Sequence, residues 1–372
     1  NEPLLRIEAP LIQAQIMETA ILNIVNYQIL IATKAARIKH LCPDEVCMEF
    51  GTRRAHEFDA AIWGTRASII GGFDATSNVK AAKLFNIPCS GTHAHSFVQA
   101  YEDEEVAFKK YAAAHKDCYF LVDTYDTLRS GIPTAIKVAD ELKDKINFHG
   151  IRLDSGDIAY LSKEARKMLD EAGYPNAKIV ASNDLDEDTI THLKQEGAVI
   201  DAWGVGTKLI TAYDNPALGA VYKLACLEND NGEMIDRLKV SENPAKLTVP
   251  GVKKVYRIIN TDTGMAAGDY IALEKEDVNA EQSIKLFHPT HTYLAKEVKN
   301  FKAIDIHEDI FVNGEQVYEV PTVQESAKYF QKNKELLWNE YLRLLNPEFY
   351  PVDLSAKCWQ NRKEILERVT KK

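Results

Sequence analysis

Two short stretches of the sequence carry side chains suited to anion binding and to proton or group transfer. FGTRRAH holds the adjacent Arg53 and Arg54, and GTHAHS holds His93 and His95 around a single alanine. Guanidinium groups offer a planar fork to carboxylates and phosphates, and an imidazole can act as a base, an acid or a nucleophile. The two stretches therefore predict an anionic substrate and at least one reactive histidine.

A third arginine, Arg152, stands in IRLDSGD two residues before Asp154. Three guanidinium groups at one site would repel each other unless anions lie between them, so the set favours a polyanionic substrate. Asp154 is placed to hold ribose hydroxyls or a hydrated Mg²⁺ beside phosphates.

The glycine-rich GVGTK stretch contains Gly204, Gly206 and Thr207. Glycines let a phosphate approach backbone N–H groups closely, Thr207 adds a hydroxyl, and Lys208 could add charge. A glycine-rich turn is often only a tight connection, but its place after a late strand favours a phosphate site.

The paired histidines admit three interpretations. Metal-dependent barrel hydrolases carry a His-x-His after a strand, but they need further ligands at later strand ends, and Arg152 stands at one of those ends instead. In the second interpretation, His95 is a nucleophile or acid–base group whose ring Asp123 orients. A histidine satisfied by local hydrogen bonds is the third interpretation, and we prefer it for His93.

Short β-rich runs alternate with amphipathic stretches from residue 46 onward, which is typical of βα repeats and a parallel sheet. One such stretch, 157–173, repeats apolar residues at helical spacing and ends at Gly173, a suitable C-cap. The strand candidates are 46–50, 69–73, 87–90, 118–122, 147–151, 178–182 and 201–205.

Each of the predicted strands is followed by polar residues or glycines. Because the βα loops of a barrel surround one site at the carboxyl ends of its strands, the pattern predicts an irregular parallel βα barrel of about seven strands. The residues concerned include Glu49, Arg53, Asp74, Thr92, His95, Asp123, Asp126, Arg152, Asp154, Asn183, Gly204 and Gly206.

The flanking segments predict a second, sandwich-like α+β domain. Residues 1–45 indicate a strand and a long helix, the barrel occupies 46–220, and 221–372 begins with strands joined by Asn-Gly and Pro-Gly turns. Two polar amphipathic helices are expected near 323–345 and 353–369. The chain opens with Asn inside the expected strand, which suggests that an upstream portion of this domain is absent.

Composition limits the compartment and the partners. A net charge of −10 argues against nucleic-acid and anionic-membrane surfaces. The apolar window 20–36 is interrupted by Asn23, Asn26 and Gln28, which the charged Lys34 follows, so it predicts a core helix rather than a membrane span. Six dispersed cysteines without a CxxC pair or a secretory leader indicate a reducing compartment, the cytoplasm.

Six stretches taken in order closely resemble the nicotinate phosphoribosyltransferase family of NAD salvage. They are EFGTRRAH, GGFDATSNV, GTHAHSFV, LVDTYDT, GIRLDSGDI and WGVGTKL, and the similarity extends to the helical IMETAILNIVNYQILIATKAAR. The resemblance implies that the chain joins nicotinate to phosphoribosyl pyrophosphate, releases pyrophosphate, and couples this step to ATP through a phosphorylated histidine. The histidine followed by serine in the motif is His95, and His93 occupies a variable position.

The resemblance and the chemistry agree on several roles. Breaking the bond at the anomeric carbon builds negative charge on pyrophosphate, so cations and Mg²⁺ are expected at the leaving group. Arg53 and Arg54 are assigned to that end with Mg²⁺, Asp154 to the ribose hydroxyls, and Gly206 with Thr207 to the 5-phosphate.

For nicotinate the resemblance implies Thr92 and Arg152, with Phe50 as a stacking face for the pyridine ring and Asp74 in the base-binding region. Asn183 and Gly204 complete the predicted substrate-binding set. Nicotinamide is the competing base.

The resemblance also implies a homodimer with shared sites, because members of the family carry an N-terminal aromatic residue that reaches the base site of the partner. Two further alternatives stay open. One is the metal-dependent barrel hydrolase, and the other is a non-catalytic truncated relative that binds phosphoribosyl ligands without turnover.

Overall fold

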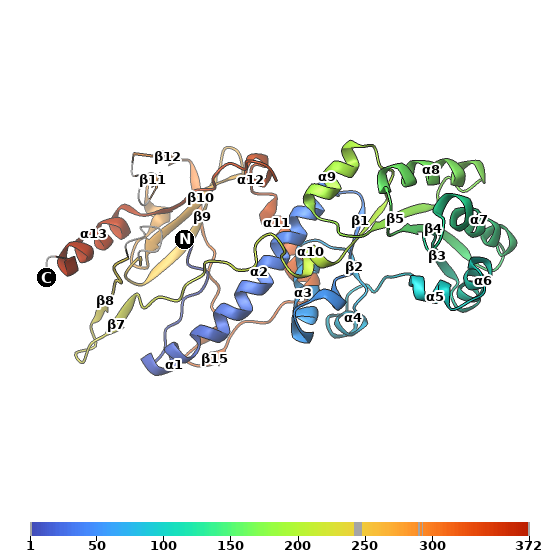
Figure 1. Ribbon diagram of the computed structural model, residues 1–372. Coiled ribbons are helices and arrows are strands. Elements are labelled where there is room, and N and C mark those ends of the chain that lie inside the picture. The colour runs from blue at the N-terminus through green and yellow to red at the C-terminus, as the bar shows by residue number, and fades with distance from the viewer. Residues whose placement is uncertain (1, 242–247, 289–290, 292, 371–372) are drawn as a thin grey trace. The chain divides into compact units, whose positions relative to one another are not determined.

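The computed structural model describes residues 2–241, 248–288, 291 and 293–370. The chain forms two compact units, which are described separately (Figure 1). The first unit consists of Asn1–Leu22, Ala220–Val320 and Lys332–Lys372, and the second of Asn23–Gly219 and Pro321–Gln331.

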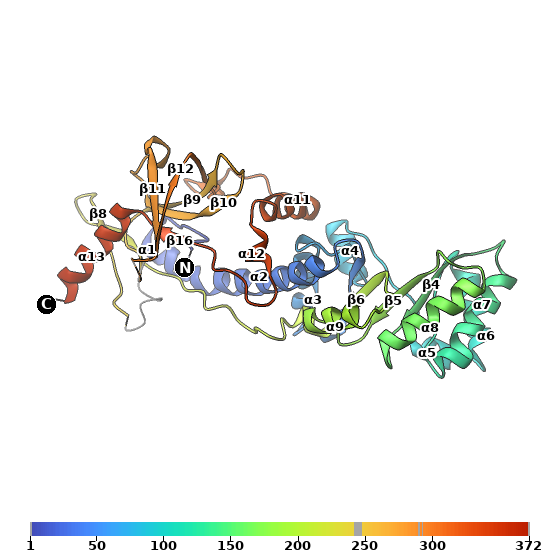
Figure 2. The same ribbon diagram turned by 90° about the horizontal axis from the view of Figure 1, so that it is seen from above.

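The second unit is built on a curled parallel sheet of six strands in a half-barrel (Figures 1 and 2). Its strand order is β2-β1-β6-β5-β4-β3, so the first and last strands along the chain, β1 and β6, are hydrogen-bonded neighbours. The strands are β1 (Val46–Glu49), β2 (Ala75–Thr76), β3 (Asp117–Leu121), β4 (Asn147–Leu153), β5 (Lys178–Ser182) and β6 (Ala202–Val205).

Helices connect these strands and cover the sheet, as βα units require. The predicted helix at 157–173 is confirmed: Asp157 caps it by accepting from the Tyr160 N–H, and Gly173 follows its end with a φ of 85°. The helices of this part of the chain are α2 (Glu18–Leu41), α3 (Phe58–Ile70), α4 (Val79–Phe85), α5 (His95–Gln99), α6 (Glu104–Ala114), α7 (Ile132–Glu141), α8 (Ile158–Glu171), α9 (Glu187–Gln195), α10 (Thr207–Ile210) and α11 (Val323–Lys334), with short turns at Thr52–Arg54 (η1) and Thr127–Gly131 (η2).

Two of the seven predicted strands are not strands. Ile69 and Ile70 end helix α3, and the strand begins only at Ala75, because two β-branched residues at a buried helix end look the same as a short strand in sequence. The segment 87–90 is reduced to a single parallel bridge between Cys89 and Thr76. The sheet of the described residues therefore has six strands, namely five of the predicted strands and the unpredicted β2.

The apolar window near the start of the chain is helical, and the strand expected before it is absent. Residues 2–9 form no strand and lead into α1 (Leu11–Ile16) and α2. The stretch Leu11–Leu41 is long and apolar enough to cross a membrane by length and composition. However, α2 packs Leu30, Ile31, Ala35 and Ile38 into the core of the second unit, as predicted for a core helix.

The first unit contains a four-stranded sheet in the order β13-β9-β10-β16 and three two-stranded ladders. The predicted Asn-Gly turn joins β7 to β8, with Gly232 at a φ of 77°, which glycine adopts without strain. The strands are β7 (Cys226–Glu228), β8 (Met234–Asp236), β9 (Lys253–Asn260), β10 (Ala266–Leu273), β11 (Ser283–Phe287), β12 (Ala295–Lys299), β13 (Phe301–Asp305), β14 (Phe311–Val312), β15 (Glu315–Gln316) and β16 (Val352–Leu354).

The helix predicted near 323–345 is broken. Helix α11 ends at Lys334 and is followed by α12 (Asn339–Leu342) alone. The second predicted helix, near 353–369, is displaced slightly, because β16 occupies its first residues and α13 (Ala356–Thr370) follows.

A buried ion pair lies at the centre of the first unit's sheet. Arg257 of β9 donates from Nε and Nη2 to the two carboxylate oxygens of Asp269 of β10, at 3.0 and 2.9 Å. Tyr350 donates to Asp269 Oδ1 at 2.9 Å, and Arg257 Nη1 donates to Asn333. Because the Asp269 side chain is only 1% exposed, every oxygen it carries is used inside the unit.

Candidate active site

Arg152, near the carboxyl end of β4, is held by three neighbours. Its Nε donates to Ser182 Oγ at 2.9 Å, Nη1 to Thr92 Oγ1 at 3.0 Å, and Nη2 to Asp154 Oδ1 at 2.8 Å. The side chain is 18% exposed. A guanidinium has five N–H donors, so the three contacts fix its plane and leave two donors for a ligand.

Asp154 uses its two oxygens differently. Oδ1 accepts from Arg152 and from the Ser182 hydroxyl, while Oδ2 lies 3.6 Å from His95 Nε2. Burial alone would raise the pKa of this carboxyl, but the Arg152 guanidinium and the Ser182 hydroxyl outweigh burial and lower its pKa. Asp154 is therefore an anion in the folded protein, with one oxygen directed away from its ion pair.

An aromatic ring adjoins the guanidinium. The Arg152 Cζ lies 5.6 Å from the ring centroid of Phe50, which follows β1. The ring occupies the space beside Gly204 of β6, where an added Cβ would lie 2.5 Å from a ring carbon. Gly204 thus makes room for Phe50, and Phe50 and Arg152 form one apolar and cationic corner.

A buried carboxylate, that of Glu49, accepts a hydrogen bond from the backbone just before the turn that carries Arg53 and Arg54. Glu49, which is fully buried, accepts from the Gly51 N–H and from the hydroxyls of Thr65 and Thr76 at 3.0 and 2.6 Å. Burial raises the pKa of Glu49. Both arginines of η1 are exposed, and neither forms an ion pair within the described residues.

The arginine turn packs against the glycine-rich turn after β6. A Cβ added to Gly51 would lie 2.6 Å from Ile210 and 2.9 Å from the Gly206 oxygen. Gly206 precedes α10, and Thr207 is its first residue. Lys208, however, pairs with Asp186 at 2.5 Å, so its charge is already balanced.

His95 is the first residue of α5, and its ring lies between groups from the end of β3. Nδ1 is 3.1 Å from Thr124 Oγ1, and Nε2 is 4.0 Å from Asp123 Oδ1. Asp123 is fixed through its other oxygen, which accepts from the Asp154 N–H at 2.9 Å and from Ser155 Oγ at 2.6 Å. Its Oδ1 is buried and has no hydrogen-bond partner in the described structure.

His93 points into the core. Its Nε2 accepts from the Leu121 N–H of β3 at 3.1 Å, beside Phe108 and Tyr111. Burial lowers its pKa to about 4, so the ring is neutral near pH 7. This hydrogen bond attaches the segment after Cys89 to the edge strand β3, with which that segment forms no β-pairing in the described part of the chain.

Two predicted residues lie apart from this group. Asp74 precedes β2, in register with Cys47 near the amino end of β1, and its carboxylate accepts from Lys39 Nζ and the Cys47 N–H. Asp74 therefore precedes a strand instead of following one, and its role in the base-binding region stays a prediction. Asn183 has a φ of 117° and its side chain accepts from the Asp184 N–H, without bonding to Arg152 or Asp154.

Three contacting residues were not predicted: Glu49 as an anchor, Thr124 and Ser182. Ser182 is 3% exposed and bonds both Arg152 and Asp154. Ser182 and Thr124 both stand at or just past a strand end, so that position is the signal that could have identified them.

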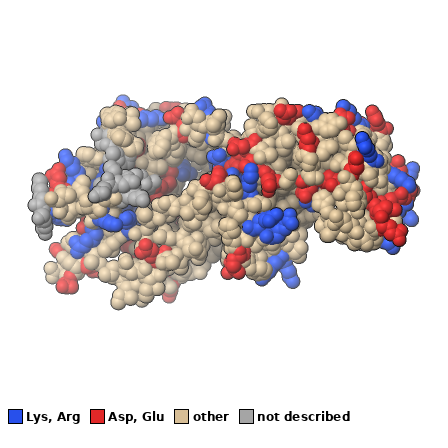
Figure 3. Space-filling view, in the orientation of Figure 1, with Lys and Arg blue, Asp and Glu red and all other residues tan. Residues whose placement is uncertain are grey.

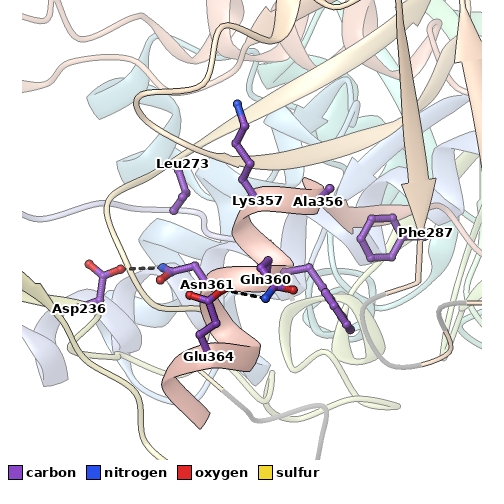
Figure 4. Close-up of a pocket in the computed structure, with 9 residues that line it drawn as sticks. Asp236, Leu273, Phe287, Ala356, Lys357, Gln360, Asn361 and Glu364 are labelled. Carbon is purple, nitrogen blue, oxygen red and sulfur yellow. Dashed lines mark hydrogen bonds between the residues drawn. The ribbon is translucent and has the colours of Figure 1, made fainter. Parts of the chain in front are cut away.

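No metal cluster of three or more His, Cys, Asp or Glu side chains exists within the described residues. This finding gives the metal-hydrolase alternative no support. A cavity of about 640 Å³ is lined by Asp236, Phe287, Trp359, Asn361 and Glu364, among others (Figure 4). All its lining residues belong to the first unit, whereas the residues around Arg152 all belong to the second.

Charge on the surface is mixed. On the face drawn in Figure 3, acidic side chains gather over the start of α6, where Glu102 and Asp103 are exposed and Glu105 is half-buried. Basic and acidic side chains are both present elsewhere on this face.

Comparison with known proteins gives one family throughout. A model described as the nicotinate phosphoribosyltransferase (NAPRTase) family matches residues 46–241, and one for the nicotinate phosphoribosyltransferase C-terminal domain matches 252–362. The chain is 64% identical over 369 residues to the nicotinate phosphoribosyltransferase of Bacillus subtilis (strain 168), covering 99% of this chain and 75% of that protein. It is 30% identical over 416 residues to the Homo sapiens nicotinate phosphoribosyltransferase, covering 95% and 75%.

Two solved structures are similar to most of the chain. The crystal structure of human nicotinic acid phosphoribosyltransferase matches with a TM-score of 0.80 and 27% identity, over 96% of this chain and 78% of that one. The nicotinate-nucleotide pyrophosphorylase of Pyrococcus furiosus matches with a TM-score of 0.61 and 26% identity, over 86% and 73%.

Proposed function

The chain belongs to the nicotinate phosphoribosyltransferase family, and we propose that it joins nicotinate to phosphoribosyl pyrophosphate. The products are nicotinate mononucleotide and pyrophosphate, in NAD salvage. The family membership supports the reaction class, and the side chains around Arg152 support the individual roles.

The observation that carries the proposal is the fixed guanidinium of Arg152 beside an aromatic ring. Three hydrogen bonds hold Arg152 against Thr92, Ser182 and Asp154, and Phe50 lies 5.6 Å away. A guanidinium that keeps free donors binds a planar carboxylate through its fork, and an aromatic face accommodates the pyridine ring. Nicotinate carries both features, whereas nicotinamide lacks the charge.

Phosphoribosyl pyrophosphate requires sites for two anionic ends and for a sugar. Arg53 and Arg54, exposed and without ion pairs in the described structure, suit the pyrophosphate. The adjacent Gly206–Thr207 turn suits the 5-phosphate, and Asp154 suits the ribose hydroxyls. As the bond at the anomeric carbon breaks, positive charge develops on the sugar and negative charge on pyrophosphate, which the arginines stabilise.

Mg²⁺ is expected to enter with the pyrophosphate rather than to reside in the protein. Mg²⁺ commonly takes one or two carboxylate oxygens and completes its shell with phosphates and water. Asp154 Oδ2, which is outside its ion pair, is the oxygen that fits this need. When bound, the ion would neutralise charge on the leaving group.

ATP coupling is assigned to His95. A ring nitrogen with a free lone pair attacks the γ-phosphorus of ATP, the bond to the bridging oxygen breaks, and ADP leaves with the electron pair. Asp123, 4.0 Å from Nε2, stabilises the positive charge that the ring then carries.

The central experiment compares bases and requires both products. We expect the chain to form nicotinate mononucleotide with release of pyrophosphate, at a higher kcat/KM for nicotinate than for nicotinamide. A preference for nicotinamide would overturn the assignment of Arg152 to a carboxylate. Binding of phosphoribosyl pyrophosphate without turnover would instead indicate a non-catalytic relative.

A labelling experiment tests the histidine. Incubation with γ-labelled ATP should give an acid-labile phosphoprotein, and His95→Ala should abolish the label while slow transfer without ATP persists. His192→Ala, an exposed histidine on α9, is the matched control and should keep the label. Label retained in His95→Ala would refute the assignment.

We also propose a homodimer in the cytoplasm. Ile12 and Ile16 of α1 expose large apolar side chains, which supports a protein contact near this helix. Light scattering coupled to size exclusion would give the mass, and a monomer at micromolar concentration would contradict the dimer.

A further inference from the structure

The two ring nitrogens of His95 face two consecutive residues that follow β3. Val122 follows β3, and the next two residues are Asp123 and Thr124. Thr124 Oγ1 lies 3.1 Å from Nδ1, whereas Asp123 Oδ1 lies 4.0 Å from Nε2. The Asp123 carboxylate thus lies on the Nε2 side of the imidazole, and the Thr124 hydroxyl lies on the Nδ1 side.

The two edges differ in charge. Nε2 faces two carboxylates, since Asp154 Oδ2 lies 3.6 Å away in addition to Asp123 Oδ1. A lone pair on Nε2 would face negative charge from both, whereas a proton there is attracted to both. Neutral imidazole has one donor and one acceptor nitrogen, so a proton on Nε2 leaves the lone pair on Nδ1.

Thr124 completes this arrangement. Its hydroxyl can donate to an unprotonated Nδ1, and the hydrogen bond to His95 is the one its side chain makes in the described structure. The Asp123 carboxylate cannot drift to the Nδ1 side, because its Oδ2 is held by the Asp154 N–H and by Ser155.

We propose that Thr124 is a positioning residue that selects the Nε2–H tautomer of His95 and so presents the Nδ1 lone pair. The inference rests on the proposed phosphorylation of His95 for its catalytic meaning, but the tautomer itself is a property of the unliganded protein. In the transfer step the Nδ1 lone pair forms the bond to the γ-phosphorus, ADP leaves with the electrons of the broken bond, and the Nε2 proton stays on the ring beside Asp123.

The tautomer can be read directly. Protein labelled with ¹⁵N in its histidine rings would be studied by long-range ¹H–¹⁵N correlation over a pH series, with the His95 signals identified by their loss in His95→Gln. We expect the neutral form of wild-type His95 to show a protonated Nε2 and an unprotonated Nδ1. A protonated Nδ1 in the neutral form would overturn the proposal.

Three variants separate positioning from simple stability. Thr124→Val keeps the shape but removes the hydroxyl, and it should give a mixture of tautomers and about tenfold slower phosphorylation by ATP, the loss expected for one hydrogen bond. Thr124→Ser should restore both readouts. Thr127→Val removes the hydroxyl of a threonine three residues further along the chain, at the start of η2, and should change neither.

Failure of this proposal and failure of ATP coupling give different results. If Thr124→Val leaves both the tautomer and the phosphorylation rate unchanged, Thr124 has no positioning role. If wild-type His95 takes no phosphate from ATP, coupling fails, and the ring spectra of wild type and Thr124→Val still decide the role of Thr124.

Discussion

Each of the two units contains an arginine–aspartate pair with equal exposure of the arginine, and the two pairs are built differently. The Arg152 and Arg257 side chains are both 18% exposed. Arg257 donates two hydrogen bonds to the two carboxylate oxygens of Asp269, and the Tyr350 hydroxyl donates a third to the same carboxylate. Arg152 meets Asp154 through one bond only, which leaves Oδ2 of the carboxylate directed at His95.

The difference separates a pair that holds a fold from a pair that can hold a ligand. The Asp269 side chain is 1% exposed and that of Asp154 is 27% exposed. A closed bidentate pair has no capacity left for a substrate, whereas a pair with an unused oxygen and free N–H donors has. Unused hydrogen-bonding capacity beside a buried charge therefore indicates function better than the ion pair itself does.

The largest expected effect is on the closed pair. Arg257→Met leaves the buried Asp269 carboxylate without its partner and should lower the free energy of unfolding by about 3–5 kcal/mol. Lys254→Met, which breaks the exposed Lys254–Asp305 pair on the same strand, should cost less than about 1 kcal/mol. Urea unfolding would measure both, and equal losses would remove the distinction between closed and exposed pairs.

The open pair should respond in activity. Arg152→Met removes the proposed carboxylate fork and should reduce kcat/KM for nicotinate by about 10²–10³-fold. Its free energy of unfolding should fall by only about 1–2 kcal/mol, since Asp154 keeps the Ser182 hydroxyl and partial exposure to water. A variant that loses stability as severely as Arg257→Met would show that this pair is structural too.

Acid should affect the units in opposite directions. The folded-state pKa of His93, about 4, lies below the ordinary 6.5, so its stabilisation is complete above pH 6.5 and is lost as pH falls to 4. Burial raises the pKa of Asp353 in the first unit from 3.8 to about 6, so its stabilisation is complete below pH 3.8 and is lost as pH rises through 6. Each shift corresponds to about 3 kcal/mol.

Hydrogen exchange resolved by peptide, and corrected for the intrinsic pH dependence of exchange, would follow both units in the intact chain. Between pH 6.5 and 4.5 we expect β3 to lose protection and β16 to gain it. His93→Asn should flatten the first response and Asp353→Asn the second. Burial raises the pKa of Glu49, so the effect of Glu49 on the pH dependence of stability in this unit is opposite to that of His93. The test is therefore the difference in pH response between each variant and the wild type.

The smallest expected effect concerns the hydrogen bond from Arg152 to Thr92. Thr92→Val removes the hydroxyl that accepts from Nη1 and should raise KM for nicotinate by up to about tenfold, the equivalent of one hydrogen bond. Thr92→Ser should restore the wild-type value. An unchanged KM for nicotinate in Thr92→Val would show that Ser182 and Asp154 suffice to orient the guanidinium.

The sequence predicts the parts of this site that follow clear strands. Arg152 lies near the end of β4, Asp154 directly follows β4, and Asp123 follows β3, so the rule for parallel strand ends correctly placed them together. Thr92 and His95 also join them, although the segment before them is only a single bridge. The curled parallel sheet could be predicted because short β-rich runs alternate with amphipathic helical stretches.

The errors have a common physical origin. Ile69 and Ile70 resemble a strand but end a helix, because two adjacent β-branched residues have no periodicity that separates the two states. As a result Asp74 precedes β2, whereas the sequence predicted that it would follow a strand. Ser182 and Thr124 are small polar residues that are common at any strand end, so only the side chains around them reveal their contacts.

The pairing of β1 with β6 sets the order in which the protein can assemble as it leaves the ribosome. The Phe50 N–H donates to the Val205 carbonyl, and the Phe50 ring needs the empty space at Gly204. These contacts can form only after the roughly 150 residues between Phe50 and β6 have been synthesised. Contacts so distant along the chain carry a large loop-closure entropy and form slowly. A nascent chain that stalls before β6 would expose the edge of β1 and depend on chaperones to avoid aggregation.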